Sequence, residues 1–168
     1  RTKFYDKNGN LLTSAADPEY IAPHCKKYED YDRVMDAGAS SKNIYFIRYA
    51  DLILLYAECL LAENDLAGAK QQVIRVRNRA KVSTPITASN NTEMLDFIYE
   101  ERMRELGMEG WRRMDLIRRG ADYFAAQVDK YNPFAKGNVQ PYHAFYPIPT
   151  NEINMNDGIG AEDQNEGY

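Results

Sequence analysis

Two amphipathic segments, residues 44–63 and 65–81, follow each other with a link of about one residue. In the first segment, apolar residues recur three and four positions apart, which is the spacing that places side chains on one face of an α-helix. The second segment follows Asp65, whose carboxylate can cap a helix by accepting backbone N–H bonds from its first turn. Helices joined by so short a link pack antiparallel, so the sequence predicts a helical hairpin.

Two further helices are predicted after this hairpin. The first follows a cap at Asn91 or Thr92 and runs to about Met108, and the second runs from Trp111 to about Gly120, with an extension over residues 123–128. Together the helices predict an all-α fold of helix pairs that resemble the tetratricopeptide repeat, whose period is about 34 residues. Arrays of such pairs bury a core between neighbours and present a binding surface.

The 168 residues suit one domain with three parts. Residues 1–43 predict a loop-rich segment of the same domain, because prolines, glycines and serines interrupt any periodicity. Residues 44–128 form the predicted helical core. Residues 129–168 are rich in Pro, Asn and Gly, and the prolines exclude a long helix because they lack the backbone N–H. We expect an extended tail packed on the helices, with a short helical turn at 150–154.

Charge and hydropathy narrow the classes of partner. With 21 Lys and Arg against 25 Asp and Glu, the net charge is -4, so nucleic-acid binding, which usually needs a basic surface, is not expected. The most apolar stretch, residues 44–62, contains Arg48, Asp51 and Glu58. A membrane-spanning helix needs about 20 mostly apolar residues with few or no charges. The sequence therefore predicts no membrane span.

The aromatic residues and the cysteines do not by themselves indicate a function. The 13 Tyr are the notable excess, and Tyr can line a sugar or peptide site because its ring offers an apolar face and a polar tip, although packing and surface roles are commoner. Two cysteines, Cys25 and Cys59, are too few for a disulfide framework. Cys59 stands in an apolar helical run and is expected to be a small buried hydrophobe.

A row of carboxylates stands out in the third predicted helix. Glu101, Glu105 and Glu109 follow at intervals of four, which could place them on one face to bind a metal or to perform acid–base chemistry. A carboxylate-bridged metal site would want a His three residues after a Glu, and neither His24 nor His143 has that spacing. Ion pairing is the favoured interpretation, with Glu100 to Arg104 along the helix and partners from the next helix, namely Arg112, Arg113 and Arg118.

Basic residues occupy every other position near the end of the second helix. Alternate positions do not share a helical face, so these side chains are expected to be scattered and solvated and not to form a phosphate-binding stripe. They are Arg75, Arg77, Arg79 and Lys81. The sequence also lacks a nucleophile motif, a phosphate-binding Gly-rich loop and zinc-type Cys/His spacing. We predict no catalytic residue, no metal and no cofactor.

Five groups of residues, in order along the chain, resemble motifs of one known family. They are residues 47–58, 76–80, 98–106, 109–120, and the C-terminal group 146–153 with 164–168. In this order and spacing they resemble the SusD/RagB family, and the resemblance covers about residues 40–168. The sequence departs from that family at Asp51, where Glu is commoner, and at Arg119, where Trp often precedes the glycine.

The resemblance implies a surface-exposed lipoprotein of the outer membrane in Gram-negative bacteria, mostly α-helical and without catalytic residues. Such proteins cap a TonB-dependent, SusC-like transporter and help to deliver oligosaccharides, or sometimes peptides. The sequence starts at Arg1 and not at a methionine, so we expect it to be part of a longer chain. The missing N-terminal part would carry the lipid anchor and most glycan contacts, and it would pack on these helices.

The matched motifs are expected to be architectural, through buried or half-buried ion pairs, and residues 164–168 are expected to fold back onto the helices. Two alternatives to glycan binding stay open: a scaffold that only docks a partner chain, and a helical enzyme that uses the carboxylate row. The residues expected to have structural roles are Arg48, Glu58, Glu101, Arg102, Glu105, Glu109, Gly110, Arg112, Asp115, Gly120, Asn165 and Tyr168.

Overall fold

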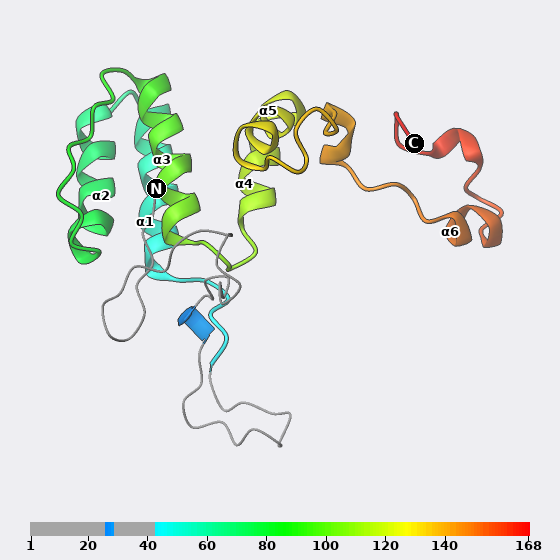
Figure 1. Ribbon diagram of the computed structural model, residues 1–168, viewed down its shortest axis with the longest axis horizontal. Helices are drawn as coiled ribbons and strands as arrows, with labels where there is room; N and C mark the ends of the chain where they lie inside the picture. The colour runs from blue at the N-terminus through cyan, green and yellow to red at the C-terminus, as the bar shows by residue number, and fades with distance from the viewer. Residues whose placement is uncertain (1–25, 29–42) are drawn as a thin grey trace, which may run out of the picture. The chain divides into compact units, whose positions relative to one another are not determined.

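The computed structural model describes residues 26–28 and 43–168 (Figure 1). The chain divides into two compact units, Arg1–Tyr45 and Phe46–Tyr168. In the first unit, the described part includes a short 3-10 helix, η1 (Lys26–Tyr28), and the Tyr28 ring lies 6.5 Å from that of Tyr45. The second unit contains all the other described helices.

Every regular element that the structure describes is helical, and residues 26–28 and 43–168 contain no strand, which confirms the predicted all-α class. In order, the elements of the second unit are α1 (Tyr49–Ala62), α2 (Leu66–Arg79), α3 (Asn91–Glu105), α4 (Arg112–Arg118), α5 (Ala121–Tyr131), the 3-10 helix η2 (Pro141–Ala144), α6 (Thr150–Met155) and the 3-10 helix η3 (Ala161–Asp163). None of the described helices is long and apolar enough to cross a lipid bilayer.

The helices α1 and α2 form the predicted hairpin, and α3 packs against both of them (Figure 1). Their shared core is apolar and fully buried, with Leu54 from α1, Val73 from α2 and Ile98 from α3 among its members. The carboxylate of Asp65 accepts a hydrogen bond of 2.8 Å from the backbone N–H of Gly68, so this residue is the N-cap of α2, as predicted.

The N-terminal end of the hairpin differs from the prediction. α1 begins at Tyr49 and not at residue 44, because the backbone of Arg48 is extended, with φ −117° and ψ 154°. The apolar side chains of Phe46 and Ile47 are exposed and do not belong to the buried face of the helix. Cys59 is also exposed and not buried, because it lies on the outer face of α1, away from Ala57 and Leu60.

The helix α3 also starts and ends differently. Its N-cap is Asn90 and neither Asn91 nor Thr92, since the Asn90 side chain accepts a hydrogen bond of 2.9 Å from the backbone N–H of Glu93. It ends at Glu105, three residues before the predicted Met108. Met108 itself has a φ of 66°, a left-handed conformation that cannot continue an α-helix.

Gly120 separates α4 from α5, where the sequence predicted one helix with an extension. Its φ of 105° and ψ of 157° belong to a region of backbone space that essentially only glycine occupies. The chain changes direction here, so that α5 packs back on α4 and buries Leu116 and Phe124 in a second, smaller core with Ala144 of η2. This glycine therefore fixes the angle at which the C-terminal part leaves the helical core.

The tail after α5 is less extended than predicted, because η2, α6 and η3 interrupt it. α6 confirms the short helical turn expected at 150–154. The side-chain amide of Gln164 pairs with the backbone of Ile148, accepting from its N–H at 2.7 Å and donating to its carbonyl at 3.0 Å. This two-bond clamp joins the last residues of the tail to the segment that follows η2.

We predict that Gly120→Ala lowers the free energy of unfolding by about 1–3 kcal/mol, because the added Cβ makes the observed backbone conformation strained. Urea unfolding followed by circular dichroism measures the change. A Gly120→Ala variant as stable as the parent would show that the joint between α4 and α5 can adopt another conformation at no cost.

Candidate functional site

The guanidinium of Arg102 is the most buried cation among the described ion pairs, with 2% of its side chain exposed. From α3 it contacts Asp51 of α1, at 2.7 Å between Nη1 and Oδ1, and Asp115 of α4, at 2.9 Å between Nη2 and Oδ1. The contact with Asp51 is an ion pair only, since Asp51 Oδ1 accepts no hydrogen bond of good geometry from the described residues. Burial would lower the pKa of Arg102, but its interactions with the carboxylates of Asp115 and Asp51 raise it overall. Arg102 thus joins three helices.

Glu58 extends this group along α1. Both of its carboxylate oxygens accept hydrogen bonds from Arg118 of α4, at 2.9 and 3.1 Å, in a bidentate pair. Tyr99 donates its hydroxyl to the same carboxylate at 3.3 Å. Burial of the ring, together with the negative charge of Glu58, raises the pKa of Tyr99 to about 12. The tyrosine therefore stays neutral and acts as a hydrogen-bond donor.

Arg48 makes a second group, just before α1. Its guanidinium donates to the carboxylates of Glu105, at 2.8 Å, and Glu109, at 2.7 Å, and to the backbone carbonyl of Glu105 at 2.8 Å. The hydrogen bond to Glu109 raises the pKa of Arg48, against the effect of burial. Glu109 was predicted to share a helical face with Glu105, but it lies in the turn after α3. Both carboxylates nevertheless meet one arginine.

A third group lies between α2 and α3. The side chains of Arg77 and Glu101 are both buried and form an ion pair of 3.0 Å, and Arg77 also donates to the backbone carbonyl of Thr84 at 2.6 Å. Arg104 donates to the same Glu101 carboxylate at 2.8 Å. Arg77 was expected to be solvated, and that prediction is wrong because the helix turns this side chain toward α3.

Two further arginines of the matched motifs, Arg112 and Arg113, contact backbone carbonyls. Arg112 donates to the carbonyl of Tyr99 at 3.1 Å, and no ion pair of Arg112 is found within residues 26–28 and 43–168. Arg113, expected to meet a carboxylate, donates instead to the carbonyls of His143 and Ala144, at 2.9 and 3.0 Å. Its guanidinium also lies 4.2 Å from the centre of the Tyr146 ring. Arg113 therefore attaches η2 to α4.

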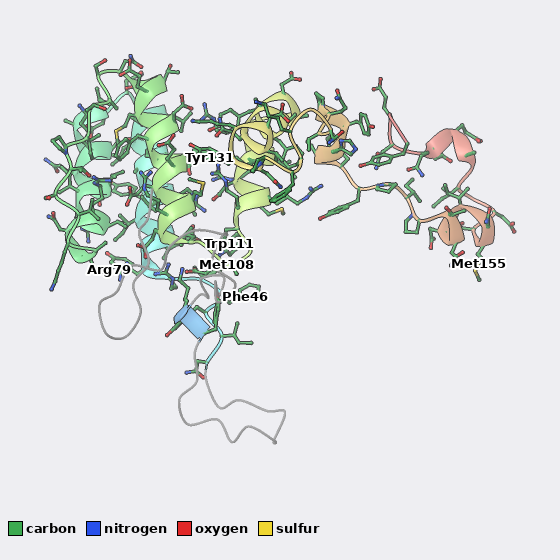
Figure 2. All side chains as sticks on the ribbon, viewed as in Figure 1. Phe46, Arg79, Met108, Trp111, Tyr131 and Met155 are labelled. Carbon is green, nitrogen blue, oxygen red and sulfur yellow. The ribbon has the colours of Figure 1, made fainter. Side chains whose placement is uncertain are left out.

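The turn between α3 and α4, where Figure 2 labels Met108 and Trp111, contains the glycine of the fourth motif. Gly110 follows Glu109 and has a φ of 85°, a left-handed conformation that glycine adopts without strain. In the part of the chain that the structure describes, no group of three or more His, Cys, Asp or Glu side chains could bind a metal ion. Each carboxylate of the predicted row, Glu101, Glu105 and Glu109, is instead paired with an arginine.

A hollow of about 550 Å³, which no sequence pattern predicted, lies at the C-terminal end. The hollow combines two aromatic rings with amide and carboxylate side chains, which is the mixture typical of small-ligand sites. It is lined by Ala121, Gln140, Pro141, Tyr142, Phe145, Asn165, Glu166 and Gly167. The proximity of residues 140–145 to residues 165–167 depends on the fold, so sequence spacing alone could not reveal it.

The last residues of the tail fix one wall of this hollow. The hydroxyl of Tyr168 donates to the carbonyl of Phe145 at 3.0 Å, and its ring meets Tyr142 edge to face at 5.2 Å. Asn165 donates its side-chain amide to the carbonyl of Tyr146 at 2.7 Å. Gly167 has a φ of 95°, and a Cβ there would come within 2.4 Å of the Tyr142 ring, so only glycine fits. Residues 165–168 thus pack on η2 and the residues after it.

The chain belongs to the SusD family, whose sequence model matches residues 2–168, and this match confirms the resemblance. SusD-like protein P25 of Formosa agariphila is 35% identical over 133 residues, which are 76% of this chain and 25% of that protein. Starch-binding protein SusD of Bacteroides thetaiotaomicron is 31% identical over 141 residues, 80% of this chain and 23% of that protein. The chain therefore spans about a quarter of the length of these relatives. No solved structure gives a significant match.

We predict that Arg102→Met lowers the free energy of unfolding by about 3–5 kcal/mol, because it leaves the buried Asp51 without its cation and Asp115 with Arg118 alone. Arg79→Met is a matched control, since Arg79 pairs with Glu105 from a side chain that is 63% exposed. The control should cost less than about 1 kcal/mol. Urea unfolding of both variants measures the difference, and equal losses would show that burial of the Arg102 pair contributes nothing specific.

Proposed function

We propose that the protein to which this chain belongs captures a glycan at the cell surface and delivers it to a TonB-dependent, SusC-like transporter in the outer membrane. The observation that carries this proposal is membership of the SusD family, together with 31% identity to a relative named as a starch-binding protein. A lipid anchor on the full-length parent would keep the protein on the outer face of that membrane.

The charged groups of the described unit support binding in preference to catalysis. An acid–base catalyst needs a carboxyl or carboxylate that is free to exchange a proton with its substrate. Glu101, Glu105 and Glu109 each accept hydrogen bonds from arginine, so their oxygens are already engaged within the protein. We infer that this network maintains the positions of α1, α2, α3 and α4, so that a binding surface keeps its shape.

A protein-docking scaffold is the second candidate. The observation in its favour is a row of exposed apolar side chains on α1, formed by Tyr49, Leu52 and Tyr56. They lie three and four positions apart, so they share the helix face that points away from the buried core. A partner helix could pack along this row. This candidate requires no sugar site, and a survey of oligosaccharide binding separates the two.

We predict that the full-length protein, as its gene encodes it, binds at least one oligosaccharide in isothermal titration calorimetry. A useful panel contains the neutral oligomers maltoheptaose, cellohexaose and laminarihexaose and the acidic oligomer of galacturonate. Sugar binding usually relies on ring stacking and a few placed polar groups, so affinity should depend on sugar identity. If no member of a broad panel binds, glycan capture is wrong and the scaffold becomes the better hypothesis.

We further predict that a TonB-dependent transporter is retained when the tagged full-length protein is purified from detergent-solubilised membranes of its native host. A soluble form that lacks the lipid anchor serves as the control, because a stable protein–protein interface should survive without the anchor. Mass spectrometry of the retained proteins is the measurement. Retention of no outer-membrane barrel with either form would contradict delivery to a transporter.

A further inference from the structure

We infer that the hollow between η2 and the C-terminal tail is a subsite for a neutral sugar unit of the glycan, an inference that rests on the proposed function. The volume of about 550 Å³ lies within the range of about 300–1,000 Å³ that small-molecule pockets occupy. Three properties of the lining support this assignment, namely its ring faces, its polar groups and its charge.

The ring of Phe145 is the natural stacking surface. It lines the hollow, it is 57% exposed, and neither an aromatic ring nor a cation stacks on it among the residues that the structure describes. A sugar ring presents C–H groups that pack on such a face, and the gain comes from covering apolar surface that water otherwise contacts. An exposed phenylalanine at the edge of a hollow thus offers stacking that the folded unit itself does not use.

Tyr142 provides a second ring whose position is fixed. Its ring packs against His143, at 4.2 Å between ring centres, and against Tyr168, at 5.2 Å, while Gly167 lies close against its face. A ring that is already immobilised loses little conformational entropy when a ligand binds. Tyr142 therefore forms a rigid wall and Phe145 an open one.

The polar lining can recognise hydroxyl groups. Asn165 uses its side-chain N–H in the 2.7 Å bond to Tyr146, and its Oδ1 accepts no hydrogen bond from the described part of the chain. Glu166 is exposed and forms no ion pair with any residue in 26–28 or 43–168. A carboxylate accepts hydrogen bonds from two neighbouring hydroxyls, and charge-assisted bonds of this kind are stronger than neutral ones. Gln140 adds an amide at the same hollow.

Charge decides which sugars fit. Glu166 is the one charged residue in the lining, and neither Lys nor Arg lines the hollow. A uronate or a sulfated sugar would bring a second negative charge close to Glu166, and like charges repel. The chemistry therefore favours a neutral sugar and disfavours an acidic one.

A second hollow, between α2 and α3, is less suited to a sugar than the C-terminal hollow. Its volume is about 360 Å³, and its lining includes Arg77, Glu101 and Arg104. These three side chains already satisfy one another through ion pairs of 3.0 and 2.8 Å. A sugar there would have to compete with a buried ion pair, which is costly to break. The C-terminal hollow requires no such rearrangement.

The first test compares Phe145→Ala with the control Phe134→Ala in the full-length protein. Phe134 is 93% exposed and does not line the hollow. Both variants should unfold at the parent's temperature, because both rings are exposed. With the neutral oligosaccharide that the parent binds, titration calorimetry should show about three- to tenfold weaker binding for Phe145→Ala and no change for Phe134→Ala.

The second test addresses charge and compares Glu166→Lys with Glu162→Lys. Both glutamates are exposed in the tail, and Glu162 does not line the hollow. Glu166→Lys should weaken binding of the neutral oligosaccharide and increase binding of oligogalacturonate, whereas Glu162→Lys should leave both unchanged. Equal effects of the two lysines would overturn the assignment of Glu166 to the subsite.

The outcomes separate this inference from the proposed function. If the parent binds a neutral oligosaccharide and Phe145→Ala binds it equally well, the subsite lies elsewhere while glycan capture stands. If the parent binds oligogalacturonate more tightly than every neutral probe, the selectivity assigned to the hollow is wrong. If the parent binds no oligosaccharide, both proposals fail.

Discussion

The burial of Arg102 between two aspartates is the interaction on which the arrangement of the helices depends. Asp51, Arg102 and Asp115 belong to three different helices, and the aspartates reach opposite nitrogens of one guanidinium. Removing charges from water is costly, and only a well-placed partner offsets that cost. The geometry of this ion pair therefore tolerates little relative movement of α1, α3 and α4. α5 and η2 pack on α4, so the hollow that η2 lines is connected to the other helices through α4.

Much of the fold follows from local sequence patterns. The hairpin of α1 and α2 was predictable because apolar periodicity, a capping residue at Asp65 and a short link all indicate the same structure. The start of α1 does not follow from the same pattern. The apolar pattern continues through Phe46 and Ile47, but the backbone of Arg48 is extended and the helix starts only at Tyr49. Apolar periodicity alone cannot report this, because it does not contain the conformation of the residue before the helix.

The site residues were harder to predict than the helices. The ion pair between Arg77 and Glu101 depends on how α2 and α3 pack. The positions of basic residues along α2 alone therefore predicted, wrongly, that Arg77 is solvated. Arg113 satisfies two carbonyls of η2, and backbone acceptors have no sequence signature. The role of Gly120 is visible only in its φ and ψ angles. The hollow is hidden from sequence for the same reason, since Phe145 and Asn165 meet through the fold of the tail.

The separation of the charged partners along the chain has a consequence for the folding pathway. Arg48 and Glu109 are 61 positions apart and Arg102 reaches Asp51 over 51, whereas α1 and α2 adjoin each other directly. Contacts between neighbouring segments form faster than distant ones, because less chain entropy is lost beforehand. Charges also keep their water until their partners are in place. We therefore expect the hairpin of α1 and α2 to form early. The arginine groups lose their water late, because this step requires all of α1, α3 and α4. We expect this late step to determine the folding rate.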